Sequence, residues 1–104
     1  MATPFAFDVR AEDGARVLVL SGELDVATAD LDRLAGAIED SDRSVVVDME
    51  GVTFIDSTAL GMLVGFQKLV NQRGLAFAIR RPTRRVEQLM AMTGLDRVLG
   101  IEAA

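Results

Sequence analysis

The chain has 104 residues, of which half are hydrophobic and 26% are charged, and its formal net charge is −5. This length and apolar content predict one folded domain over residues 1–104. Because the chain has no cysteine and no histidine, its composition excludes disulfides, thiol catalysis, ordinary zinc sites, histidine phosphorelay and histidine acid–base catalysis. The acidic balance makes nucleic acid and anionic membrane surfaces poor partners.

The location of the protein follows from two negative features of the sequence. The first five residues lack the basic and apolar regions of a signal peptide. The longest apolar run, residues 59–66, is far shorter than the roughly 20 residues that a membrane-spanning helix needs. We therefore expect a cytoplasmic, soluble protein.

The chain begins with the pattern of a β-hairpin. Phe5, Phe7 and Val9 alternate with other residues at the period of a half-buried strand. Residues 12–14 carry a turn signal, and residues 17–20 are typical of the returning strand. The sequence then predicts a loop over residues 21–25.

A helix and a buried strand are predicted next. Apolar residues recur at helical spacing from Ala27 to Ile38, with Asp25 or Thr28 able to cap the helix start. The β-branched run over residues 44–48 favours a central strand covered on both faces. We expect a short loop from there to Ser57.

The last part of the chain predicts two further αβ steps. A helix should run from Ser57 to about Gln72 and stop before Gly74. A strand over 75–79, a short helix ending near Gly94 and a last short strand over 98–101 follow. The order predicts an α/β fold with one mixed sheet of four to five strands and three to four helices.

The hydroxyl of Ser57 is the candidate functional group. It stands at the expected start of a helix, where unpaired backbone N–H groups and partial positive charge suit a phosphate. Asp56 or Ser57 would equally serve as an ordinary helix N-cap, and the two roles are compatible.

The predicted helix after Asp56 has two distinct faces. Steps of about 100° per residue place Ala59, Leu63, Phe66 and Val70 on a core face. Ser57, Gly61, Val64 and Lys68 fall on the opposite face, with Leu60 at its border. An exposed apolar patch around a small glycine, beside a modifiable hydroxyl, favours a protein interface controlled by charge.

Three segments together resemble the STAS-domain anti-sigma factor antagonists. They are Gly22-Glu23-Leu24-Asp25, the stretch from Val47 to Ser57, and Thr93-Gly94-Leu95-Asp96. The resemblance covers nearly the whole chain, and the central segment is the specific one. It implies a STAS-like fold and a partner-switching protein.

The resemblance also implies partners and site residues. The unphosphorylated protein would bind an anti-sigma factor that is also a serine kinase, and so free a sigma factor. The kinase would phosphorylate Ser57, and a PP2C-type phosphatase would reverse this. Asp56 would lie beside Ser57 at the partner surface, with Gly22, Glu23 and Asp25 bordering it. Thr58 offers a second hydroxyl where many relatives have serine. The chain itself would need no cofactor, because ATP and magnesium belong to the kinase.

Several other interpretations stay open. A STAS module without phosphorylation, in a lipid-transport or stress-signalling assembly, is the main alternative. Asp48 would be the phosphoacceptor of a receiver domain, but Lys68, the only lysine, is predicted on a helix. The arginines around Pro82 either bind an acidic partner or form a solvated loop and helix start. Without a ligand group or histidine beside Glu23 and Asp25, we expect no enzymatic activity.

Overall fold

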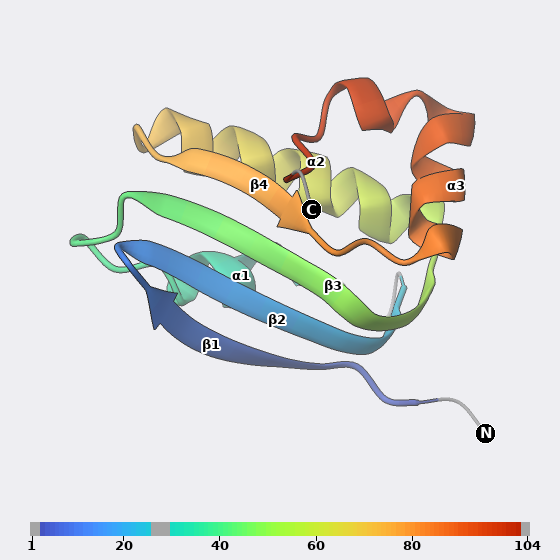
Figure 1. The fold of residues 1–104 in the computed structure, drawn as a ribbon, viewed down its shortest axis with the longest axis horizontal. Coiled ribbons are helices and arrows are strands. Elements are labelled where there is room, and N and C mark those ends of the chain that lie inside the picture. The colour runs from blue at the N-terminus through green and yellow to red at the C-terminus, as the bar shows by residue number, and fades with distance from the viewer. Residues whose placement is uncertain (1–2, 26–29, 103–104) are drawn as a thin grey trace.

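A computed structural model describes residues 3–25 and 30–102 of the chain. Within these residues four strands form one sheet in the order β1-β2-β3-β4, with helices α1 and α2 on one face (Figure 1). The sheet is mixed, because β1 runs antiparallel to β2 whereas β2, β3 and β4 run parallel. The predicted α/β class and its single mixed sheet are confirmed.

Strands β1 (Ala6–Glu12) and β2 (Ala15–Leu24) form the predicted hairpin. Its two-residue turn places Asp13 at φ 51° and Gly14 at φ 87°, the left-handed conformations that a tight hairpin turn requires. Strand β2 continues to Leu24, so the loop predicted over residues 21–25 is wrong for most of its length. The continuation depends on two register shifts, between Val19 and Ser21 and between Gly22 and Glu23.

Strand β3 (Ser44–Ile55) extends well beyond the predicted end at Asp48. Its second half pairs with the end of β2, up to the pair Leu24 and Ile55. The predicted loop between Asp48 and Ser57 is therefore wrong, because both strands continue through their irregularities. A single residue, Asp56, separates β3 from the next helix.

Helix α1 (Leu31–Gly36) is shorter than predicted. Its N-cap is Asp30, whose carboxylate accepts a hydrogen bond from the backbone N–H of Arg33. Asp25 is therefore not the cap, and Thr28 lies outside the described residues. The Arg33 guanidinium lies 5.0 Å from the centroid of the Phe7 ring, a cation–π contact between α1 and β1.

Helix α2 (Ser57–Gln72) and strand β4 (Ala76–Arg80) have the predicted positions. The helix ends at Gln72, two residues before Gly74, which has φ 79°. Helix α3 (Arg84–Thr93) is capped at its start by Thr83 and at its end by Gly94, also with positive φ. A short 3-10 helix, η1 (Leu95–Arg97), follows.

The predicted last strand is reduced to one bridge between Ile101 and Ile79 of β4. The Ile79 N–H donates to the Gly100 carbonyl, and the Glu102 N–H donates to the Ile79 carbonyl. The chain thus covers a small part of the outer edge of β4. The other edge of the sheet is β1.

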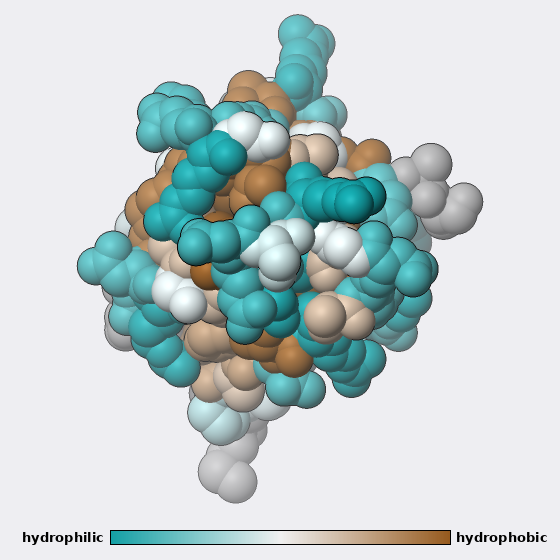
Figure 2. Space-filling model, turned by 90° about the vertical axis from the view of Figure 1, so that its left-hand side faces the viewer, coloured by the Kyte–Doolittle hydropathy of each residue, from teal (hydrophilic) through white to brown (hydrophobic). Residues whose placement is uncertain are grey.

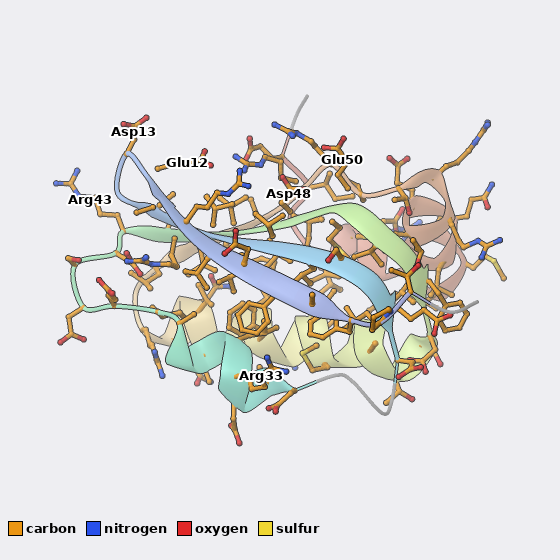
Figure 3. All side chains as sticks on the ribbon, turned by 90° about the horizontal axis from the view of Figure 1, so that it is seen from below. Glu12, Asp13, Arg33, Arg43, Asp48 and Glu50 are labelled. Atoms are coloured by element: carbon orange, nitrogen blue, oxygen red, sulfur yellow. The ribbon has the colours of Figure 1, made fainter. Side chains whose placement is uncertain are left out.

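The two faces of the sheet differ in chemistry. Alternate strand residues on the helix-covered face, such as Leu18 and Val47, join Phe66 of α2 in the core, and all three are fully buried. The opposite face carries an ion-pair network. Figure 3 shows Glu12, Asp48 and Glu50 on one side of the sheet and Arg33, a residue of α1, on the other.

Candidate functional site

The start of α2 presents two exposed hydroxyl side chains. Asp56 is the N-cap, and its Oδ1 accepts a hydrogen bond of 2.8 Å from the Ala59 N–H. The Asp56 carbonyl accepts from the Leu60 N–H at 3.0 Å. Ser57 and Thr58 follow the cap and are both exposed. Capping therefore uses Asp56 and leaves the Ser57 hydroxyl at the surface.

The end of β2 lies beside this helix start. Leu24 pairs with Ile55, and the Asp56 N–H donates to the Leu24 carbonyl at 3.3 Å. Glu23 and Asp25 flank Leu24 and are half-buried. Two sequence segments that are about thirty residues apart in the chain thus meet at one end of the sheet.

The predicted faces of α2 are mostly confirmed, with two corrections. Ala59, Leu63, Phe66 and Val70 are fully buried, and Ser57, Gly61 and Lys68 are exposed. Leu60, which we expected at the interface border, is also fully buried. Val64, which we expected to be exposed, is half-buried and packs against the core. Helix α1 packs beside α2, so more of the surface of α2 is covered than the sheet alone would cover.

Gly22, another expected partner-binding residue, is buried. It has φ 80°, and a Cβ built there would lie 2.1 Å from the Pro4 carbonyl oxygen. The same chain segment is held by a hydrogen bond of 3.0 Å from the Glu23 N–H to the Thr3 carbonyl. The glycine therefore serves the passage of the N-terminal segment over β2, and its side-chain position is closed to a partner.

Open space surrounds the exposed glycine of α2. A Cβ added at Gly61 or at Gly65 would meet no atom within 4 Å. Phe54, three residues before Ser57, has 39% of its surface exposed although Val52 and Ile55 are buried. Sequence reasoning did not single out Phe54, because it treated the segment between Asp48 and Ser57 as a loop. The irregular pairing of β2 and β3 is what turns its side chain outward.

Asp48 is engaged in an ion-pair network. It lies within β3, its Oδ1 accepts from the Glu50 N–H, and its Oδ2 accepts from Arg80 Nε at 3.3 Å. Arg80 also pairs with Glu12 at 3.2 Å, and Arg81 pairs with Glu50 at 3.0 Å. Arg80 hydrogen-bonds to Glu12 and holds the pKa of that carboxyl below its ordinary value of 4.5.

This network weakens two of the open interpretations. A receiver-type phosphoacceptor stands at the end of a strand, whereas Asp48 is five percent exposed and in mid-strand. Lys68 is on α2, as expected. Arg80 and Arg81 both form ion pairs with acidic residues of the same chain. Two of the four arginines around Pro82 are therefore paired within the chain.

A second group of ion pairs lies at the end of the sheet opposite to the start of α2. Arg16 pairs with Asp42 through two hydrogen bonds of 3.0 and 3.1 Å, and with Glu39 at 3.0 Å. Arg16 holds the pKa of Asp42 below its ordinary value of 3.8, with help from the Glu39 N–H. A cavity of about 300 Å³ adjoins this group, lined in part by Ile38, Arg73 and Leu75.

The surface at this far end is chemically mixed. Figure 2 views it directly and shows hydrophilic side chains interrupted by small, separate apolar areas. Among the described residues, no cluster of three or more acidic side chains could hold a metal ion. None of the helices in those residues is long and apolar enough to cross a membrane.

Comparison with protein families identifies the fold. Residues 6–104 match the model of the STAS domain. The chain belongs to the STAS domain family. Within this family, it is similar to an anti-sigma F factor antagonist of Paenibacillus polymyxa, with 34% identity over 91 residues that cover 85% of this chain and 78% of the relative.

Solved STAS structures have the same fold. An anti-sigma factor antagonist from Mycobacterium paratuberculosis superimposes with a TM-score of 0.85 at 23% identity, over 100% of this chain and 92% of the other. The Bacillus cell fate determinant SpoIIAA in its phosphorylated form gives 0.68 at 19% identity, over 94% and 92%. These likenesses confirm the STAS fold that the sequence predicted.

Proposed function

We propose that this STAS domain is an anti-sigma factor antagonist whose binding is switched off by phosphorylation of Ser57. The unphosphorylated form binds an anti-sigma factor that is also a serine kinase, and thereby frees a sigma factor. The observation that carries the proposal is the exposed Ser57 hydroxyl directly after the N-cap of α2. The curated relatives, named as antagonists of anti-sigma F and anti-sigma-B factors, support the partner class.

The proposed partner surface is built around the start of α2. Its members are the exposed or half-buried residues at this end of the sheet: Glu23, Asp25, Phe54, Asp56, Ser57, Thr58 and Gly61. Gly61 lets a partner approach the helix backbone closely, since nothing lies above its Cα. Gly22 and Leu60 support this surface from beneath, because both are buried. The half-buried side chain of Val64 lies at the border of this surface.

The switch would act through charge and leave the fold in place. A phosphate adds about −1.5 to −2 charges, next to the carboxylate of Asp56. The helix start tolerates an anion, since its first N–H groups carry partial positive charge. The docked partner does not, and a penalty of roughly 3 kcal/mol weakens binding about a hundredfold.

The cycle needs two enzymes besides this chain. The kinase supplies ATP and magnesium, and a PP2C-type phosphatase returns Ser57 to its hydroxyl form. Phosphoryl transfer moves the γ-phosphoryl group of ATP to the Ser57 oxygen and leaves ADP, with the hydroxyl proton going to the kinase or to water. Hydrolysis by the phosphatase then releases inorganic phosphate.

The decisive experiment is incubation with the cognate kinase and ATP, followed by intact-mass measurement. We expect a gain of one phosphate that Ser57→Ala abolishes. Thr58→Ala is the matched control, because Thr58 is equally exposed one residue further along, and it should still gain the phosphate. A gain that survives Ser57→Ala and disappears in Thr58→Ala would move the switch to the second hydroxyl.

Absence of any mass gain with the kinases that bind the chain would contradict the proposal. The protein would then be a STAS interaction module without phosphorylation, in a lipid-transport or stress-signalling assembly. Binding of the anti-sigma factor, measured by calorimetry, separates these outcomes, because such a module would not bind one.

A further inference from the structure

Within residues 3–25 and 30–102, strand β1 is an edge of the sheet that no further strand covers. It has one hydrogen-bonded neighbour, β2, in the order of the four strands, and six of its seven residues are exposed (Figure 1). An edge strand presents unpaired backbone N–H and C=O groups that can pair with another chain. The opposite edge, β4, is partly covered by the bridge to Ile101.

The hairpin geometry determines which groups of β1 point outward. Glu12 and Ala15 close a two-residue turn and pair through the backbone. Because hydrogen-bonded positions alternate along an antiparallel pair, the backbone groups of Phe7, Val9 and Ala11 point away from β2. The Val9 N–H agrees with this direction, since it donates to the side chain of Asp8 at 3.0 Å in an exposed position.

We propose that the occupant of this edge is a second copy of the same chain, paired antiparallel through β1 about Val9. A two-fold axis at Val9 places the outward-pointing residues opposite one another, with Val9 facing Val9 and Phe7 facing Ala11. The two sheets then continue into one. Val9, which is 38% exposed in the single chain, is covered by its own counterpart.

Charge complementarity supports this register. Asp8 and Arg10 lie on the same face of β1, two residues apart, and both are exposed. Pairing about Val9 sets Asp8 of each copy directly across from Arg10 of the other, twice per dimer. Among the described residues, neither side chain forms an ion pair within the chain.

Neighbouring registers are less favourable. A shift of the axis to Asp8 sets the two Asp8 carboxylates against each other, and a shift to Arg10 sets the two guanidinium groups together. Like charges directly opposite each other in a sheet are destabilising. The register about Val9 is also the one that uses all seven residues of β1.

A charge-swap series measured by sedimentation equilibrium tests the dimer. Asp8→Arg should weaken dimerisation about tenfold, because it exchanges two opposite-charge pairs for two like-charge pairs. Arg10→Asp should do the same. The double variant Asp8→Arg with Arg10→Asp restores complementary charges and should return the dimerisation constant to within about threefold of the original.

Asp40→Arg is the matched control. Asp40 is exposed in a turn at the far end of the molecule, and its substitution raises the net charge by the same two units as Asp8→Arg. Reduced overall repulsion alone would strengthen association in both variants. The proposal predicts weakening in Asp8→Arg and no weakening in Asp40→Arg. Amide exchange at Phe7, Val9 and Ala11 should also slow as concentration rises.

Three results would overturn the proposal. One is a monomer at every concentration up to about 1 mM, where even a weak pairing free energy of about 4 kcal/mol becomes visible. Another is a folded double variant, verified by circular dichroism, that fails to regain dimerisation. The third is a monomer whose charge swaps alter binding of the anti-sigma factor, since the edge would then belong to that partner.

Discussion

A division of roles between Asp56 and Ser57 explains how a reactive position can lie at a helix start. The Asp56 side chain accepts the capping hydrogen bond from the Ala59 N–H. Such an N-cap contributes about 1 kcal/mol to stability. Because Asp56 serves as the cap, the Ser57 side chain is not needed for capping, and it is exposed. Modification of Ser57 can therefore change the surface without removing the cap.

Asp42 makes the strongest case for a pH-dependent contribution to stability. Asp42→Asn should lower the free energy of unfolding by about 2 kcal/mol at pH 7, because it breaks a largely buried pair with Arg16. The folded pKa of Asp42 lies below 3.8, so the pair stabilises the fold above that value. This stability is lost as the pH falls through the folded pKa.

Urea unfolding at pH 7 and at low pH measures the effect. The difference between Asp42→Asn and the unchanged chain should shrink as the pH falls through the folded pKa of Asp42, which lies below 3.8, since residue 42 is neutral in both proteins once the pH is below that pKa. Asp40→Asn, an exposed neighbour, should change stability little at either pH. An equal loss at both pH values would show that the contribution of Asp42 is not ionic.

At the scale of elements, helix periodicity was the most informative sequence signal. It predicts both ends of α2 and its four fully buried core residues, because a core face repeats every three to four residues. It does not reveal the burial of Leu60 or the packing of Val64 against the core. The exposure of Ser57 and Gly61 was therefore predicted correctly, whereas the burial of Leu60 and the partial burial of Val64 were not.

Strand ends were the least predictable elements. Polar residues and glycines at positions 21–25 and 48–51 are typical of loops, yet β2 and β3 pair through both segments. Register shifts absorb residues that a regular ladder would not accept. Since such irregularities depend on the paired strand, no local pattern in either segment reveals them, and the exposure of Phe54 was missed for the same reason.

Gly61 of α2 allows the proposed partner surface to be tested apart from stability. Gly61→Leu should raise the thermal midpoint, because a leucine in a helix is favoured over glycine by about 0.5–1 kcal/mol and the added side chain meets open space. The same side chain should obstruct the partner and weaken anti-sigma factor binding at least tenfold. Calorimetry and thermal unfolding measure the two effects.

Gly36→Leu provides the control for this substitution. Gly36 is the last residue of α1, is exposed, and also has open space around it. The variant should keep the binding affinity of the unchanged chain. Undiminished binding by Gly61→Leu would remove this face of α2 from the interface.

At the scale of the whole molecule, the sheet is strongly twisted. The β4 residue in register with Glu12 of β1 is Ala76, three strand spacings or about 14 Å away in a flat sheet. Arg80, four residues further along β4, nevertheless reaches Glu12 at 3.2 Å. Twist brings opposite corners of the sheet toward each other on the face without helices. The ion pair between these strands closes across that face, away from the start of α2.

Separation between the scaffold and the switch predicts the behaviour of a phosphate mimic. Ser57→Asp should leave the thermal midpoint nearly unchanged, because Ser57 is exposed and an acidic residue suits a helix start. It should weaken anti-sigma factor binding by tenfold or more, whereas Ser57→Ala should bind normally. Undiminished affinity of Ser57→Asp in calorimetry would count against the charge mechanism.

The bond between Thr3 and Glu23 has a practical consequence for anyone who tags this protein. It holds Thr3 against the end of β2, which lies next to Ser57. A fluorescent dye coupled at residue 3 would thus report docking at close range, while a bulky affinity tag at that position would obstruct the same surface. Attachment of the dye or tag to the exposed turn at Asp40 keeps it away from the proposed partner surface.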